Sequence, residues 1–171
     1  MAKRYDTAAV DLPSDTEVRV RRDFKAPRTL VWQAHTDPKL LKRWLVGYPG
    51  WSMPVCEMDV RLGGTYRWRW RQDADGAEFG FFGTFIEVSE PARLTYDQFY
   101  DPAGFTSAMQ TDNRCVISGS FDEANGVTTL TTVMDFGTKE ARDAAVSTGM
   151  TDGMEMGYER LDNLFAEEQA G

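Results

Sequence analysis

A succession of short segments that alternate apolar and polar residues, each ended by glycine or proline, limits what this chain can fold into. The clearest reads TYRWRWRQ over residues 65–72, and a period of two is typical of a β-strand with one buried face. Asn125-Gly126 predicts a tight hairpin, so the strands form an antiparallel meander, with a loop expected through Pro102 and Gly104. Further strands are expected at residues 16–25, 55–60, 79–88, 93–100, 114–121 and 127–136.

Helical patterns flank these strands. Pro27 opens a helical stretch after the first strand, and Asp37-Pro38 starts a second short helix, where the Asp37 side chain is expected to cap free amides. Glycines recur every fourth residue from 149 to 157, which predicts either a close approach to the helix backbone or a bend near Gly149. A long helix over about residues 139–169 is predicted from an apolar face with helical spacing, made of Met150, Met154, Tyr158, Leu161 and Phe165.

The length of 171 residues fits one domain, expected over residues 16–171 behind a flexible arm at 1–15. Uninterrupted apolar runs are far shorter than the roughly 18 residues of a membrane span. The N-terminus has no apolar segment of the kind found in secretory signals, so we expect a cytoplasmic protein. Cys56 and Cys115 are then expected to be reduced thiols buried as small apolar residues.

Charge and ligand chemistry exclude several classes of partner. The net charge is −8, with a basic N-terminal part and an acidic C-terminal part. A basic region with interleaved aromatics is a nucleic-acid pattern, but phosphate binding requires surplus positive charge, so we expect no nucleic-acid partner. Neither cysteine has another cysteine or a histidine at the spacing typical of metal ligands, and His35 is the single histidine. We therefore predict no metal and no cofactor. His35 itself is expected to pack or to cap a helix.

The strand over residues 65–72 has two chemically different faces. One face carries arginines that are expected to face solvent, namely Arg67, Arg69 and Arg71. The other carries aromatic side chains that either pack as core or line a cavity, namely Tyr66, Trp68 and Trp70. The methionines of the C-terminal helix carry the same two alternatives. Trp44 in the second short helix and Trp51 in the loop after it either fix that loop or gate a pocket entrance.

The acidic residues of the predicted strands do not form a pair that could act as general acid and general base in catalysis. Asp59 and Arg61 are expected to form a structural ion pair before the Gly63-Gly64 turn. Glu87 and Asp97 are carboxylates in apolar strands, and a buried carboxylate could act as a general base. No catalytic residue is predicted.

Four segments in this order resemble the heat-shock protein 90 ATPase activator homologues of the START-like superfamily. They read APRTLVWQAHTDPKLLKRW, DVRLGGTYR with Trp51 before it, FGTFIEVSEPARLTY and GMTDGMEMGYERLDNL. The resemblance covers about residues 16–168. It implies the α+β helix-grip fold, in which a curved antiparallel sheet wraps around a long C-terminal helix, with two short helices after the first strand.

The resemblance and the residues together favour non-catalytic binding of a small hydrophobic molecule between the sheet and the C-terminal helix. One alternative is a cyclase- or aromatase-type enzyme in which Glu87, Tyr96 or Asp97 moves protons. Another is surface-mediated activation of a heat-shock ATPase, and a chaperone or homodimer partner stays open. The predicted ligand-binding residues, with the first two near the pocket mouth, are Trp44, Trp51, Tyr66, Trp68, Trp70, Phe85, Phe99, Met150 and Met154.

Overall fold

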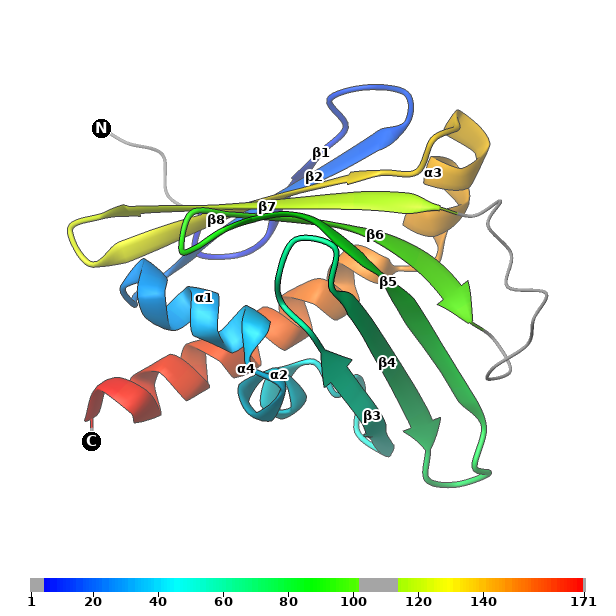
Figure 1. Ribbon diagram of the computed structural model, residues 1–171, viewed down its shortest axis with the longest axis horizontal. Coiled ribbons are helices and arrows are strands. Elements are labelled where there is room, and N and C mark those ends of the chain that lie inside the picture. Colours follow the sequence, from blue (N-terminus) through cyan, green and yellow to red (C-terminus); the bar gives the residue numbers. More distant parts are fainter. Residues whose placement is uncertain (1–4, 102–113, 171) are drawn as a thin grey trace.

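A computed structural model describes residues 5–101 and 114–170, and in them eight strands form one antiparallel sheet (Figure 1). The strand order β1-β2-β8-β7-β6-β5-β4-β3 confirms the predicted meander, with β2 closing against the last strand. The loop expected through Pro102 and Gly104 lies outside the described residues. The strands are β1 (Ala9–Asp11), β2 (Glu17–Phe24), β3 (Trp51–Met58), β4 (Thr65–Gln72), β5 (Glu78–Ser89), β6 (Arg93–Asp101), β7 (Cys115–Ala124) and β8 (Val127–Asp135).

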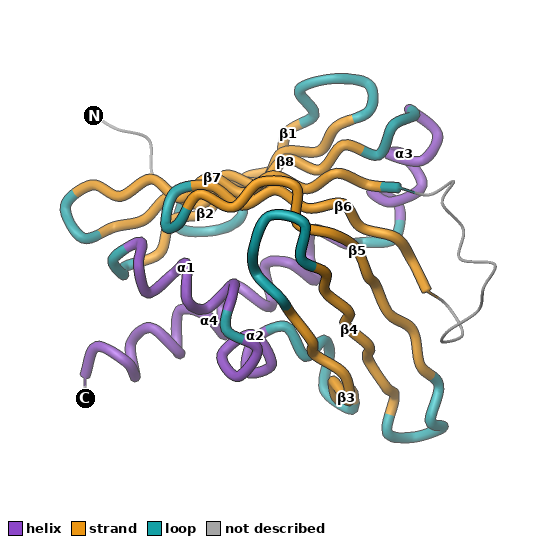
Figure 2. The backbone as a smooth tube through the Cα atoms, viewed as in Figure 1, coloured by secondary structure: helices purple, strands orange, loops and turns teal. Residues whose placement is uncertain are grey.

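Three helices lie on one face of the curved sheet, which we name the inner face (Figures 1 and 2). They are α1 (Arg28–Thr36), α2 (Pro38–Trp44) and α4 (Met150–Ala170), while α3 (Lys139–Ser147) precedes α4. This arrangement confirms the predicted helix-grip fold. Among the described residues, no helix is long and apolar enough to span a membrane.

Local sequence signals explain most element boundaries. The Asp37 carboxylate accepts a hydrogen bond from the Lys39 amide at 2.9 Å, which confirms the predicted cap of α2. Asn125 and Gly126 have φ values of 55° and 79°, as the predicted hairpin requires. Gly149 has a φ of 79° between α3 and α4, a conformation that favours glycine. The single long helix predicted for residues 139–169 is therefore divided in two.

Two segments that the sequence predicted as irregular belong to β-strands. Trp51 begins β3 and is not in the preceding loop as predicted. Residues 9–11, in the segment expected to be an arm, pair with β2 as an edge strand, with Val10 opposite Val20. The isolated alternation of three residues was too short a signal to predict this strand.

Arg22 holds α4 against the sheet from within the core. It shares the inner face of β2 with Val18 and Val20 and is 3% exposed. Its guanidinium donates to Glu155 Oε1 and to Asp162 Oδ2, each at 2.8 Å. Desolvation works to lower the pKa of Arg22, but the hydrogen bonds to these carboxylates outweigh it and hold the pKa above its usual value. A charged group buried this deeply fixes the position of its partners, because losing either one leaves an uncompensated charge.

The two cysteines are free thiols, as predicted. Cys115 is buried on β7, and Cys56 is half-buried on β3. Burial raises the pKa of Cys115 to about 12 and that of Cys56 to about 11. Both side chains therefore stay protonated and weakly reactive at neutral pH.

Arg69 corrects the prediction that all three arginines of β4 face solvent. Its side chain lies on the outer face, opposite the tryptophans, but is 4% exposed. Nη1 donates to Asp101 at 2.8 Å, and Nε donates to Glu78 at 3.0 Å. Arg71 is exposed as predicted, and Arg67 is half-buried. The sequence pattern could not reveal this ion pair, because Asp101 comes from β6, two strands away.

Replacing Arg69 by Met is expected to lower the free energy of unfolding by about 3–5 kcal/mol, because Asp101 then stays buried without its cation. Arg71→Met, on the same strand but exposed, is the matched control and should change it by less than about 0.5 kcal/mol. Urea unfolding measures both values. Equal effects of the two substitutions would contradict a buried ion pair at Arg69.

His35 packs against aromatic rings of the core. Its ring lies 4.9 Å from that of Trp44 and 5.4 Å from that of Phe121. Nδ1 lies 2.8 Å from the Val31 carbonyl oxygen, which can only accept, so Nδ1 carries the proton. Burial lowers the pKa of His35 from 6.5 to about 4, although the bond to Val31 opposes the shift.

This depressed pKa predicts a loss of stability in mild acid. The unfolded chain takes up a proton on His35 below about pH 6.5, whereas the folded chain does so only near pH 4, so stability falls across that window as the pH falls. Between pH 7 and pH 4.5 the wild type should lose about 2 kcal/mol more than His35→Phe. Urea unfolding at both pH values tests this, and parallel losses in the two proteins would show that His35 is not buried as a neutral ring.

Candidate functional site

Aromatic side chains from three neighbouring strands cover the inner face of the sheet. The strand registers place Trp68 opposite Phe81, and Phe85 opposite Tyr96. Most of these rings contact one another edge-on or tilted, with Tyr66 and Trp68 centroids 4.5 Å apart and Trp68 and Tyr96 centroids 6.1 Å apart. Trp70 and Phe79 are stacked, with centroids 5.2 Å apart. Such geometries are favourable for aromatic pairs. The complete cluster consists of Tyr66, Trp68 and Trp70 on β4, Phe79, Phe81 and Phe85 on β5, and Tyr96 and Tyr100 on β6.

These rings differ in how far they are covered. Tyr66, Trp68, Trp70 and Phe85 are 1–7% exposed and form part of the core. Phe79, Phe81 and Tyr96 are half-buried, and Tyr100 is 42% exposed. Half-buried rings therefore lie beside buried ones along these strands, as Phe79 does beside Trp70 and Tyr96 beside Phe85.

The helix opposite shows the same change along its length. Burial on α4 begins at Gly157 and continues to Phe165, whereas the first two turns, with Met150 and Met154, are only half-buried. A Cβ atom at Gly157 would lie 3.4 Å from the Trp44 ring, which is the predicted close approach. A Cβ atom at Gly153 would meet no atom nearer than the Tyr48 hydroxyl at 3.9 Å. The start of α4 thus has space beside it that its middle does not have.

Tyr96 shows where the accessible surface lies. It sits on β6, inside the sheet between β5 and β7, and its ring contacts Tyr66 and Phe85 on the inner face. The ring is nevertheless half-buried and not fully buried, while burial holds its pKa well above the usual tyrosine range. Its ring lies on the face that α4 covers, and Tyr158 of α4 is one of its electrostatic neighbours. We name five of the partly buried residues that pack against the core, Phe79, Phe81, Tyr96, Met150 and Met154, the inner patch.

Three aromatic side chains of this region donate hydrogen bonds to backbone carbonyls. Trp70 Nε1 donates to the Leu45 carbonyl at 2.6 Å. The Tyr66 hydroxyl donates to the Asp97 carbonyl at 2.7 Å. Trp44 Nε1 donates to the Ala34 carbonyl at 2.8 Å. Trp68 Nε1 is buried with no hydrogen-bond partner in the part of the chain that the structure describes.

The structure brings together most of the nine predicted ligand-binding residues. Tyr66, Trp68, Trp70 and Phe85 form the closed part of the aromatic cluster, and Met150 and Met154 belong to the inner patch. Trp51 lies edge-on to Phe79, with ring centroids 5.4 Å apart. Trp44 is 6% exposed and stacks on Tyr158, so it lies between α2 and α4 and not at an open mouth.

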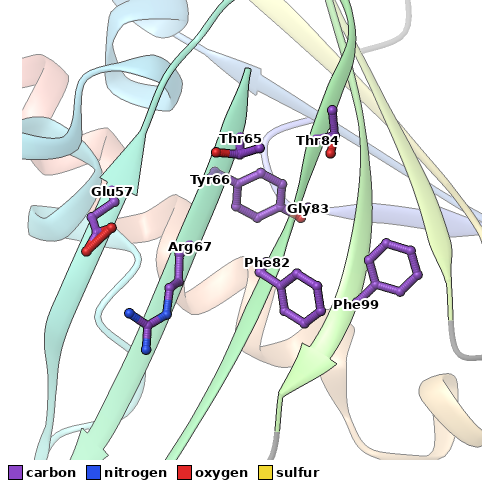
Figure 3. Close-up of a pocket in the computed structure, with 8 residues that line it drawn as sticks. All are labelled: Glu57, Thr65, Tyr66, Arg67, Phe82, Gly83, Thr84 and Phe99. Carbon is purple, nitrogen blue, oxygen red and sulfur yellow. The ribbon is translucent and has the colours of Figure 1, made fainter. Parts of the chain in front are cut away.

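Phe99 is the residue that the structure separates from the others. It lies three residues after Tyr96 on β6, so it projects from the outer face, where its ring stacks on Phe82 at 5.4 Å. Both rings border a pocket of about 370 Å³ on that face (Figure 3). The pocket is lined by Glu57, Thr65, Tyr66, Arg67, Phe82, Gly83, Thr84 and Phe99. Sequence reasoning grouped Phe99 with the inner rings because it did not apply the alternation of faces along β6.

Sequence reasoning also missed Phe79 and Phe81 as site residues. Their position two residues apart on β5 was a usable signal, because it puts both on the face that carries Phe85. What the sequence could not provide was the strand register, which places Phe81 beside both Trp68 and Tyr100. Accessibility of these two rings depends on how far α4 extends across the sheet.

The polar residues considered for proton transfer do not converge. Glu87 accepts hydrogen bonds from Thr95 at 3.2 Å and Arg93 at 3.3 Å. Asp97 accepts from the Thr84 amide at 2.8 Å and from Arg114 at 3.3 Å. Both carboxylates lie on the outer face, whereas Tyr96 lies on the inner face, so these three groups do not surround one substrate.

Two further sequence expectations concern charged groups. Asp59 and Arg61 form the expected ion pair, with Nε and Oδ2 2.7 Å apart, in the loop between β3 and β4. Within residues 5–101 and 114–170, no three histidine, cysteine or acidic side chains are grouped so that they could hold a metal ion. The described site is therefore built from aromatic and sulfur-containing side chains with few charges.

Known proteins share both the sequence pattern and this fold. The family model described as Activator of Hsp90 ATPase homolog 1-like protein matches residues 25–166. A solved structure from Rhodobacter sphaeroides is 31% identical, with a TM-score of 0.84 over 94% of this chain and 99% of that chain. No curated protein matches the chain in sequence.

More distant structures have the same fold. Protein Ms6760 from Mycobacterium smegmatis is 24% identical, with a TM-score of 0.80 over 92% of this chain and 96% of that chain. Protein NE0264 from Nitrosomonas europaea is 25% identical, with a TM-score of 0.77 over 94% of this chain and 100% of that chain. Since the family model spans most of its length, the chain belongs to the Activator of Hsp90 ATPase homolog 1-like family, with the START-like helix-grip fold.

Proposed function

We propose that this chain binds one small, largely apolar molecule on the inner patch, beneath the first two turns of α4. The observation that carries the proposal is the partial exposure of Tyr96, on an interior strand and on the face that α4 covers. An apolar patch that stays accessible on a folded protein is typical of a site that binds a ligand or partner. The proposal includes no catalytic step and no cofactor.

The composition of the inner patch suits such a ligand. Phe79, Phe81 and Tyr96 offer flat apolar surface, and aromatic pairs of this kind dominate the energetics of apolar sites. Met150 and Met154 are flexible and polarisable, so they can adjust to a ligand of irregular shape. The Gly153 position, with only the Tyr48 hydroxyl near it, leaves room for entry between α4 and the segment before β3.

The outer pocket is less suited to the same role. Its lining mixes the Phe82–Phe99 stack with Glu57, Arg67 and two threonines on an exposed sheet face (Figure 3). An apolar ligand there would stay in contact with water over much of its surface. Ligand sites usually bury most of the ligand, so we favour the inner patch.

Gly153→Leu tests the proposal, because leucine would fill the space beside the start of α4. The neutral dye N-phenyl-1-naphthylamine should bind the wild type saturably with one site per chain, and its emission measures the affinity. Gly153→Leu should weaken binding about tenfold or more while the protein stays folded, since glycine is the poorer helix former. Glu159→Leu adds the same side chain at an exposed position of α4 and should bind as the wild type does.

The result can contradict the proposal in two ways. If the wild type binds no dye, the inner patch is ordinary core and a surface-mediated role becomes the better explanation. If Gly153→Leu binds as tightly as Glu159→Leu, the dye occupies another surface, with the outer pocket as the first candidate.

A further inference from the structure

The indole N–H of Trp68 is an unsatisfied hydrogen-bond donor beside the inner patch. The side chain is 7% exposed, and among the described residues Nε1 has no partner. This nitrogen is the side chain's single polar atom, so its hydrogen-bonding capacity is unused altogether. A buried donor without a partner is uncommon in folded proteins and carries a free-energy cost.

Two other tryptophans near the inner patch, Trp70 and Trp44, have hydrogen-bond acceptors for their indole N–H groups. Trp70, two residues along the same strand, donates to the Leu45 carbonyl at 2.6 Å. Trp44 donates to the Ala34 carbonyl at 2.8 Å. The fold therefore supplies backbone acceptors for Trp70 and Trp44 but, within the described residues, leaves Trp68 without one. The ring centroids of Trp68 and Tyr96 of the inner patch are 6.1 Å apart.

The charges on the inner face limit which acceptor can reach Trp68. Arg22, the buried cation on this face, is already held by Glu155 and Asp162. His35 is neutral, because burial lowers its pKa to about 4. A carboxylate or phosphate buried here would lack a cation and would lose its hydration without compensation. A neutral acceptor avoids that cost.

We propose that the ligand of the inner patch is a neutral, largely apolar molecule with a carbonyl-type oxygen, which accepts a hydrogen bond from Trp68 Nε1. This inference rests on the proposed function and narrows it from apolar ligands in general to apolar ketones, esters or amides. Nε1 is buried in this conformation, so the acceptor reaches it when a neighbouring side chain moves. Trp68 is then a specificity-determining residue, because it distinguishes a carbonyl from the corresponding hydrocarbon.

A matched pair of probes tests this directly. Benzophenone and diphenylmethane have the same two rings and differ at the central carbon, which is a carbonyl in the first and a methylene in the second. Each displaces N-phenyl-1-naphthylamine from the full chain, and the ratio of their dissociation constants measures the preference for the carbonyl. Comparing this ratio between proteins cancels the difference in hydration of the two probes.

Trp68→Phe keeps an aromatic ring and removes the N–H. The preference for benzophenone should fall about tenfold in this variant, because the benzophenone carbonyl loses the hydrogen bond from the indole N–H, and one such bond is worth about that much in affinity. Diphenylmethane should bind wild type and variant within about twofold. Trp70→Phe is the matched control, since its N–H already serves Leu45, and it should keep the wild-type preference.

Each outcome separates this inference from the proposed function. If both probes displace the dye and the preference is the same in wild type and Trp68→Phe, the carbonyl inference is wrong and apolar binding stands. If the dye does not bind the wild type, the proposed function fails and the inference fails with it. Should Trp68→Phe not fold, the unmodified protein decides: the Trp68 indole N–H resonance must move downfield with benzophenone and not with diphenylmethane.

Discussion

The buried ion pairs of Arg22 with Glu155 and Asp162 determine where α4 crosses the sheet, and the accessible part of the inner face follows from that position. Arg22 lies on β2, and both carboxylates lie in α4 at or beyond residue 155. The close contact of Gly157 with Trp44 fixes the same part of the helix to α2. Breaking a buried pair by removing one partner is strongly destabilising, so this arrangement resists change.

The first turn of α4, before Glu155, lies outside both of these contacts. Gly149 ends the regular conformation of α3, and α4 starts at Met150 with residues that are only half-buried. The curved sheet extends beyond this end of the helix through β4, β5 and β6 (Figure 1). Half-buried aromatic rings thus lie next to the closely packed core on the same face of the sheet.

The sequence predicted the fold better than it predicted the site. Alternation along β4 identified its aromatic face, and the Asn125-Gly126 pair identified the hairpin between β7 and β8. Each of these signals lies within one short segment of the chain, so it can be recognised without knowledge of the tertiary structure. The buried ion pair of Arg69 with Asp101, by contrast, can be predicted only when the pairing of β4, β5 and β6 is known. The accessibility of Tyr96 can be predicted only when the position of α4 is known. Phe99 could have been assigned to the outer face from its odd spacing to Tyr96, whereas the isolated N–H of Trp68 is visible only when its surroundings are known.

The central claim is that an apolar molecule binds on the inner patch beneath the start of α4, and methyl NMR on methionine-labelled protein tests it most directly. Titration with N-phenyl-1-naphthylamine should shift the methyl signals of Met150 and Met154 saturably with one dye per chain. Met134, a buried core methionine of β8, should keep its position and serve as the internal reference. Stationary Met150 and Met154 signals at a dye concentration that saturates the fluorescence change would contradict the account.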